Sequence, residues 1–272
     1  MPTIQLPDEI EIYRDRSWCR EPELQVLEVG AAERLIERLG FCAALTDSSR
    51  PGPSLYIAVC GRRDAHMPRN VQKDPESSLA WNIKDEMIRR SRAYYGKLTG
   101  GRSVFIARRL VSNFNTLRGI THRQERLVMS EAAKKILKCL RKEWELSTPD
   151  LRKASGIADR STFSSAIDEL QRNFKVLPSD VVYDRKLTYI WSLTESRFRD
   201  ELTVGMSREE ALKEIARAYL LGAGMTWRGE LARVTGLTNP EAGIGNWALV
   251  DEDFATRVVP GVYRLKELKE SL

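Results

Sequence analysis

The chain has 272 residues, of which 42% are apolar and 30% are charged, enough for one large domain or two to three small ones with buried cores. No apolar run approaches the roughly 18 residues of a membrane span, and the N-terminus lacks the apolar region of a signal peptide. The sequence therefore predicts a cytoplasmic protein with no membrane partner. Its four cysteines are scattered without CxxC spacing, which predicts reduced and mostly buried thiols.

The net charge of +6 is distributed unevenly along the chain. Residues 81–120 contain nine Lys and Arg but only two Asp and Glu, and residues 121–200 are also net basic. Residues 1–80 and 201–272 are both net acidic. A localised basic region is the footprint expected for a polyanionic partner, usually nucleic acid, because the two acids of residues 81–120 cannot neutralise that segment locally.

Three predicted helices and a hairpin follow a short N-terminal extension. The segments "GAAERLIERLGFCA", "PGPSLYIAVCG" and "LAWNIKDEMIRRSRAYYG" predict helices, with Cys42 in the core of the first. The segment "YYGKLTGGRSVFIA" predicts two short strands joined by a Gly-containing loop, a hairpin whose basic surroundings are where a β-wing would meet phosphate. The third helix is not cleanly amphipathic, since Ile83 and Met87 lie on one side and Trp81 and Ile88 on another. It is expected to pack between units rather than to expose a reading face.

The clearest pattern lies in residues 130–194. Helical spacing in "SEAAKKILKCLRKEW", a short helix in "STPDLRKASG" and an apolar stripe from Phe163 to Phe174 predict three helices. Alternating apolar residues on both sides of a "DRK" turn then predict a β-hairpin. This order is that of a winged helix, whose third helix is suited to a major groove and whose hairpin reaches backbone or minor groove.

A third copy of this order follows in the acidic C-terminal part. "SREEALKEIARAYLLGAG" opens with a capping box formed by Ser207 and Glu210, and "MTWRGELARVTGL" predicts a second, short helix. The remaining residues predict a last helix and a degenerate wing ending in "GVYRL". Because this copy is acidic, the favoured interpretation is a packing unit that does not contact DNA.

The sequence therefore predicts an α+β, mainly helical fold of three tandem winged-helix units. The predicted boundaries are an N-terminal extension over 1–29, a winged helix with a basic wing over 30–115, a second over 116–200, and a degenerate acidic one over 201–272.

Several segments resemble the tandem winged-helix family that includes the bacterial DNA glycosylases that unhook interstrand crosslinks and remove alkylated purines. These segments are "LYIAVCGRR", "WNIKDEMIRRSRAYYGKL", "YIWSLTE" and "EALKEIARAYLLGAGMTWRGELARVTGL", and the resemblance spans most of residues 50–240. It implies the fold and DNA binding. Those glycosylases carry a catalytic Gln-x-Gln motif, and no such motif occurs among the glutamines here, which are Gln5, Gln25, Gln72, Gln124 and Gln171.

The first function predicted is therefore a DNA-binding protein without catalysis or cofactor, which contacts duplex DNA, damaged or distorted DNA included, in genome maintenance or transcription. The alternative is a DNA-repair enzyme of the winged-helix glycosylase type with divergent catalytic residues. A weaker alternative is a protein-interaction scaffold, since winged helices also serve as docking modules. The predicted location is the cytoplasm, or the nucleoid in a bacterium or archaeon, and both a monomer and a homodimer remain open.

The catalytic candidates are Gln124 and Glu125, because a Gln–Glu pair between two basic units is placed to position a water. Metal sites at Cys42, Cys60 and His66, or in the acidic run 251–253, lack a recognisable spacing, so no metal is predicted. The predicted DNA-binding residues are basic or small and polar, and they are Arg89, Arg90, Arg92, Lys97, Arg102, Arg108, Arg109, Arg160, Ser161, Ser164, Arg172, Arg185 and Lys186.

Overall fold

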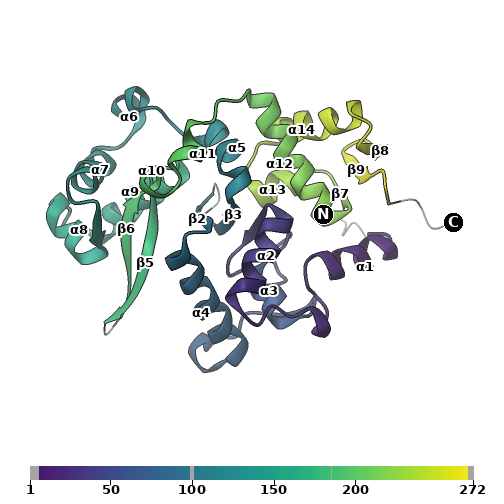
Figure 1. Ribbon diagram of the computed structural model, residues 1–272, viewed down its shortest axis with the longest axis horizontal. Coiled ribbons are helices and arrows are strands. Elements are labelled where there is room, and N and C mark those ends of the chain that lie inside the picture. The colour runs from purple at the N-terminus through teal and green to yellow at the C-terminus, as the bar shows by residue number, and fades with distance from the viewer. Residues whose placement is uncertain (1–5, 99–100, 185, 269–272) are drawn as a thin grey trace.

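The computed structural model describes residues 6–98, 101–184 and 186–268, and Figure 1 shows their arrangement. The same order of elements occurs three times: a helix, a short strand, two helices and a hairpin. In each repeat the short first strand pairs antiparallel with the last strand, so the three sheets have the orders β1-β3-β2, β4-β6-β5 and β7-β9-β8. The predicted α+β, mainly helical fold class is confirmed.

The repeats are named here by their position in the chain. The first repeat comprises α2 (Val29–Leu39), β1 (Phe41–Ala43), α3 (Leu55–Cys60), α4 (Pro75–Arg90), β2 (Ala93–Lys97) and β3 (Ser103–Ala107). The second repeat comprises α7 (Glu131–Glu143), β4 (Glu145–Ser147), α8 (Thr148–Ser155), α9 (Arg160–Arg172), β5 (Val176–Asp184) and β6 (Lys186–Leu193). The third repeat comprises α12 (Arg208–Ala223), β7 (Met225–Thr226), α13 (Glu230–Thr235), α14 (Asn239–Asp251), β8 (Ala255–Val259) and β9 (Val262–Leu265).

Other helices precede or connect the repeats, and one 3-10 helix lies within the first repeat between α3 and α4. These are α1 (Asp8–Ser17), 3-10 helices at Pro22–Leu24 and Val71–Lys73, α5 (Arg108–Arg118), α6 (His122–Val128), α10 (Thr194–Arg197) and α11 (Arg199–Thr203). No helix within the described residues is both long and apolar enough to cross a membrane.

The first and third repeats share one hydrophobic core. Phe41 of β1 contacts Phe114 of α5 edge to face and stacks on Tyr219 of α12, with ring centroids 5.6 and 6.1 Å apart. Within the third repeat, α12 and α14 approach so closely that a Cβ at Gly245 would lie 2.5 Å from the carbonyl oxygen of Leu212. This leaves room only for glycine, which fixes the contact between the two helices.

The second repeat has a core of its own and joins the first repeat through α4 and the β2–β3 hairpin. Helix α4 packs on α2, α3, β2 and β5, and Ile83, Met87 and Ile88 are all buried. The expectation that this helix packs between units is confirmed. Its buried contacts explain the poor amphipathicity of the sequence, because more than one of its faces is covered.

Candidate nucleic-acid interface

The β2–β3 hairpin forms part of the core instead of projecting as a free wing. Tyr94 on β2 and Phe105 on β3 are fully buried, and Tyr94 stacks on Phe174 of the second repeat with centroids 4.6 Å apart. Both strands are covered by other elements, so the expected phosphate contact is left to the basic residues around the hairpin. Positions 99 and 100 of its loop lie outside the described residues.

Most cations of the basic segment have acidic partners that other parts of the chain supply. Three of these ion pairs reach later elements of the chain: Arg89 Nε to Asp180 Oδ1 at 2.9 Å, Lys97 Nζ to Asp168 Oδ1 at 2.6 Å, and Arg108 Nε to Glu201 Oε1 at 2.6 Å. Residues 81–120 contain few acids, and the tertiary fold brings acidic partners to their cations from other parts of the chain. These three pairs link segments that lie far apart in the sequence.

Arg90, Arg92 and Arg109 lie near α2. Arg90 and Arg92 both approach Glu33, and Arg109 Nε lies 3.2 Å from Glu37 Oε1. Arg90, Arg92 and Arg108 line a hollow of about 510 Å³. Because exposed ion pairs contribute only about 0–1 kcal/mol each, these arginines remain able to exchange a carboxylate for a phosphate.

Arg102 differs from its neighbours, since no ion pair involves it within the described part of the chain. Burial lowers the pKa of its guanidinium, and the positive charges of Arg50 and Arg233 lower the pKa further. Among the predicted contact residues in and around the first hairpin, Arg102 is the one without an acidic partner in the described structure.

The outward face of α9 is the most open of the predicted contact surfaces. Arg160, Ser161, Ser164 and Arg172 are exposed, and the described contacts include no ion pair of either arginine. The two acids on this helix already have partners inside the protein. Asp168 binds Lys97, and Glu169 accepts hydrogen bonds from the backbone N–H and the hydroxyl of Ser130, at 2.9 and 2.6 Å. Their repulsion of a phosphate backbone is correspondingly weakened.

The β5–β6 hairpin of the second repeat projects beside α4, and in Figure 1 its tip extends away from the body of the molecule. Arg89 Nη2 donates to the carbonyl of Val181 at 2.7 Å, and the Tyr183 hydroxyl donates to Asp85. These contacts fix the direction of the hairpin against α4. Lys186 near its tip is exposed, whereas the predicted contact Arg185 lies outside the described residues.

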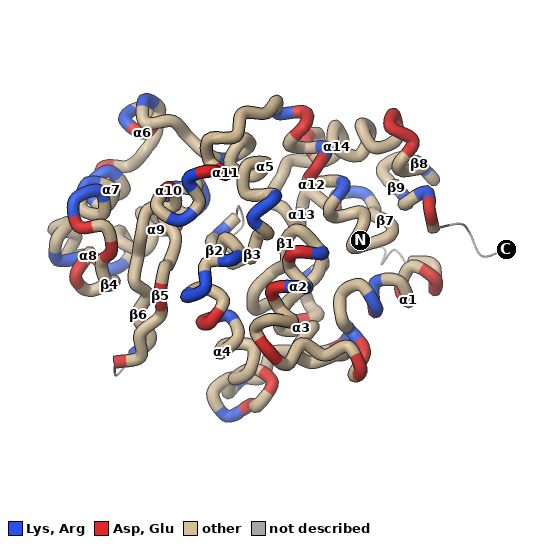
Figure 2. Tube along the Cα trace, viewed as in Figure 1, with Lys and Arg blue, Asp and Glu red and all other residues tan. Residues whose placement is uncertain are grey.

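Figure 2 shows several Lys and Arg positions along α7, and α6 is basic as well. Arg123 and Arg126 of α6 and Lys135 and Lys138 of α7 are exposed, and no ion pair involves them in the described ranges. The sequence shows that these short segments are basic. It does not show that their cations lack ion pairs while those near the first hairpin have them, so these four residues were not among the predicted contacts.

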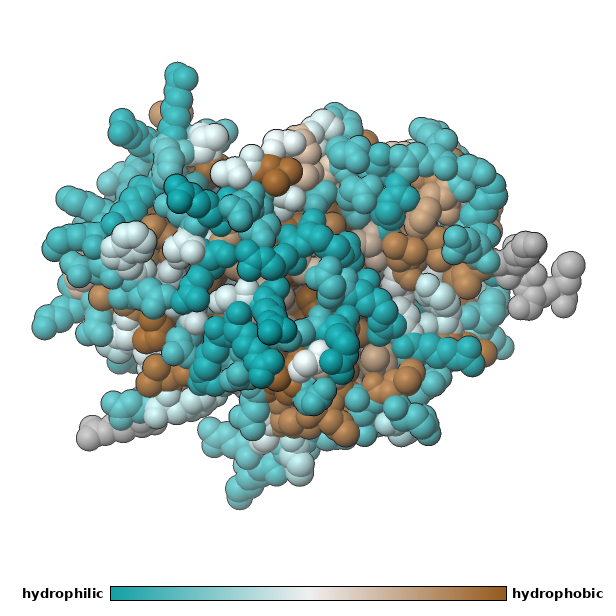
Figure 3. All heavy atoms as spheres, viewed as in Figure 1, coloured by the Kyte–Doolittle hydropathy of each residue, from teal (hydrophilic) through white to brown (hydrophobic). Residues whose placement is uncertain are grey.

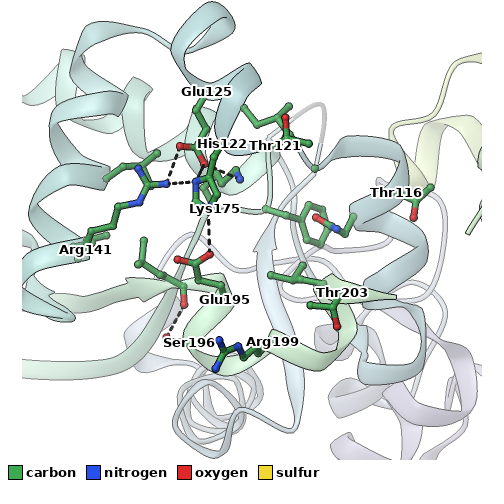
Figure 4. A pocket seen from close by; sticks show the side chains of 18 of the residues that line it. Thr116, Thr121, His122, Glu125, Arg141, Lys175, Glu195, Ser196, Arg199 and Thr203 are labelled. Atoms are coloured by element: carbon green, nitrogen blue, oxygen red, sulfur yellow. Dashed lines mark hydrogen bonds and ion pairs between the residues drawn. The ribbon is translucent and has the colours of Figure 1, made fainter. Parts of the chain in front are cut away.

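A cavity of about 970 Å³ lies between the second repeat and the connecting helices, lined by residues of α5, α6, α7, α10 and α11 (Figure 4). Glu125 of α6 is buried in its wall, with Oε2 2.7 Å from Arg141 Nη2 and Oε1 2.8 Å from Lys175 Nζ. Burial raises the pKa of this carboxyl, but the hydrogen bonds and charges of Lys175 and Arg141 outweigh burial and bring the pKa to about 2. Glu125 is therefore ionised at neutral pH and is a weak base.

The neighbouring polar groups of the cavity are also engaged. Arg141 Nη2 lies 2.9 Å from His122 Nδ1, and the same ring nitrogen lies 3.2 Å from Glu125 Oε1. Figure 4 shows Glu195 of α10 pointing toward this group, with Oε2 4.0 Å from His122 Nε2. Gln124, the other catalytic candidate, caps α6: its Oε1 accepts from the Thr121 N–H at 2.8 Å. The structure thus places Glu125 in the cavity wall and gives Gln124 a structural role.

Glu125→Gln is expected to lower the free energy of unfolding by about 2 kcal/mol at neutral pH, because it removes a carboxylate whose folded pKa is depressed. The stabilisation is complete above the ordinary Glu pKa of about 4.3 and is lost as the pH falls towards 2. The difference between wild type and variant in urea denaturation should therefore shrink from pH 6 to pH 2.5. Glu131→Gln, at an exposed pair with Lys134, serves as the matched control. A pH-independent difference would contradict the assignment.

Residues of the two metal sites weighed from the sequence take part in packing and in ion pairs. Cys42 lies on β1 and is fully buried, so its expected place in a helix is wrong, since the chain leaves α2 at Gly40 and extends. Glu252 binds Lys213 and Arg217, and Asp253 binds Lys266. Over the described ranges no three His, Cys, Asp or Glu residues are grouped closely enough to hold a metal ion.

The fold is similar to that of the Streptomyces sahachiroi DNA glycosylase AlkZ, with a TM-score of 0.56 and 16% sequence identity over 94% of this chain and 70% of that one. At this identity the likeness shows the fold. A family model described as AlkZ related matches residues 26–221, which is well over half of the sequence, so the chain belongs to the AlkZ-related family. The resemblance stated from the sequence is thereby confirmed. No curated protein matches the chain.

Proposed function

We propose that this protein binds duplex DNA, damaged or distorted DNA included, and that its three repeats are winged-helix units. The observation that carries this proposal is the outward face of α9, where Arg160 and Arg172 are exposed without an acidic partner in the described structure. In a winged helix this third helix is the one that enters a major groove, and the adjacent hairpin with Lys186 reaches the backbone. Membership of the AlkZ-related family supports DNA as the partner. This role places the protein in the cytoplasm or nucleoid.

The protein-interaction scaffold receives less support. The face of the molecule in Figure 3 is mainly hydrophilic, and its apolar areas are interrupted by polar side chains. A docking surface for a protein usually presents a larger continuous apolar patch. The charge distribution and the free cations of the second repeat are better suited to a polyanion.

The test is fluorescence anisotropy with a labelled duplex at several salt concentrations between about 50 and 200 mM. The variant Arg160→Ala/Arg172→Ala/Lys186→Ala is expected to bind about 10- to 100-fold more weakly and to reduce the slope of log K against log salt by about 2 to 3, because about 0.9 counterion is released per phosphate contact. The control Arg16→Ala/Arg69→Ala/Lys73→Ala removes three exposed cations without an ion pair in the described chain. Equal weakening of both variants would show only a nonspecific charge effect.

A second candidate is base excision, which the buried, ionised Glu125 in the wall of the large cavity supports. With a pKa of about 2, this carboxylate is suited to stabilising positive charge on a deoxyribose and is a poor proton acceptor. The assay is release of free base from an alkylated duplex by wild type and by Glu125→Gln. Release by wild type that is lost in the variant would favour the enzyme, and no release by wild type would leave DNA binding without catalysis.

A further inference from the structure

Three arginines from distant parts of the sequence converge where the first and third repeats meet. Arg50 lies in the loop that follows β1, Arg102 at the end of the β2–β3 loop, and Arg233 on α13. Contacts of their sequence neighbours place these segments side by side. The Ala44 N–H donates to the carbonyl of Ser103 at 2.9 Å, and a Cβ at Gly52 would lie 2.9 Å from Val234 Cγ2.

The acids nearest to these arginines in the sequence are held elsewhere. Asp47, three residues before Arg50, accepts from the backbone N–H groups of Ser49 and Met67 at 3.1 and 3.2 Å. Glu230, three residues before Arg233, is buried against Arg14 with Nη1 and Oε1 3.0 Å apart. Across the residues that the structure describes, no ion pair involves Arg50, Arg102 or Arg233. Arg50 and Arg233 therefore each repel Arg102 without an ion pair that neutralises either of them in the described chain.

The surroundings of the three groups suit an external ligand. Arg50 and Arg233 are exposed, and Arg102 is half-buried. The lowered pKa of Arg102 is consistent with this crowding of positive charge. A guanidinium presents several N–H donors in a planar fork that matches the oxygens of a phosphate, and it stays charged even when crowded. An anion bound among the three would relieve their repulsion.

We propose that Arg50, Arg102 and Arg233 form a phosphate-binding site that takes a phosphodiester of the DNA backbone. The site deepens the proposed function and rests on it. It brings the third repeat into the interface, although that repeat is acidic as a whole, because Arg233 is presented from α13 toward the first repeat. It also gives the first hairpin a DNA contact at the end of its loop, while the strands of that hairpin stay buried.

The variant Arg50→Ala/Arg102→Ala/Arg233→Ala is expected to weaken duplex binding about 10- to 100-fold and to lower the salt slope by about 2 to 3. The control is Arg16→Ala/Arg69→Ala/Lys73→Ala, which carries the same change in net charge and is expected to keep wild-type affinity and slope. Wild-type affinity and slope in the arginine variant, with DNA binding intact in wild type, would overturn the site and leave the proposed function standing.

A measurement without DNA separates the two failures. Thermal unfolding in inorganic phosphate and in chloride at equal ionic strength is expected to show a higher midpoint in phosphate for wild type and control, and no difference for the arginine variant. If wild type binds no DNA but shows this phosphate effect, the proposed function and the phosphodiester assignment both fail, and the site takes free phosphate. If the phosphate effect is also absent, the site itself is overturned. Since the variant relieves repulsion, its midpoint in chloride should be no lower than that of wild type.

Discussion

Arg14→Leu is expected to lower the free energy of unfolding by about 3–5 kcal/mol, because it leaves the Glu230 carboxylate buried without its partner. The side chains of Arg14 and Glu230 are 3% and 0% exposed, and two hydrogen bonds of 3.0 and 3.1 Å join them. Arg14 Nε also donates to the carbonyl of Ala223 at 3.0 Å, and its guanidinium lies over the rings of Trp18 and Trp227. Urea denaturation followed by far-UV circular dichroism measures the loss.

Two comparisons show whether burial is the cause. Arg34→Leu breaks an ion pair with Glu28 in which the side chains are 73% and 70% exposed, and the expected cost is about 0–1 kcal/mol. In Arg14→Leu/Glu230→Leu no buried charge is left unpaired, so this double variant should be more stable than Arg14→Leu alone. If Arg14→Leu and Arg34→Leu cost the same, the pair does not anchor α1 to the third repeat.

The elements predicted correctly from the sequence are mostly long segments with periodic apolar residues. The stripe on α9 reflects one buried and one exposed face, which local sequence records directly. Burial along β5 and β6 does not alternate, because the residues near the tip of this hairpin are exposed on both faces. The first strand of every repeat was missed, because β1, β4 and β7 have only three, three and two residues and no period is measurable over so few. Helices α5 and α6 were not predicted either, and α5 is held by its contact with α12, a tertiary partner that lies far along the chain.

The candidate interface was less predictable than the fold, because charge along the sequence does not reveal which cations the fold neutralises. The sequence near Lys97 and Arg108 offers few acidic partners. In the fold, Asp168 and Glu201 from later segments form ion pairs with them. Arg50 and Arg233 lie in segments that are acidic overall, so local composition gave no reason to select either. What distinguishes Arg50 and Arg233 from other exposed arginines is the packing of the first repeat against the third, which brings both of them near Arg102.

Tyr94→Ala is expected to lower the free energy of unfolding by about 3–5 kcal/mol, because it leaves a cavity where the first and second repeats pack against each other. The ring is fully buried, stacks on Phe174 and meets Phe198 edge to face with centroids 5.8 Å apart. Its hydroxyl donates to the carbonyl of Gln171 on α9 at 3.3 Å. Tyr94→Phe keeps the ring and should cost about 1 kcal/mol, the usual value of one hydrogen bond. Urea unfolding of both variants measures the difference.

The contact between the first and second repeats also positions the proposed DNA contacts, because Tyr94 and the Lys97–Asp168 pair hold α9 against the β2–β3 hairpin. In Tyr94→Ala, at a temperature where the variant is still folded, α9 is free to shift relative to the site formed by Arg50, Arg102 and Arg233. Duplex affinity should then fall while the salt slope decreases, since fewer phosphates are reached at once. Tyr94→Phe should retain both. Unchanged DNA binding by a folded Tyr94→Ala would mean that the second repeat engages DNA independently of the first and third.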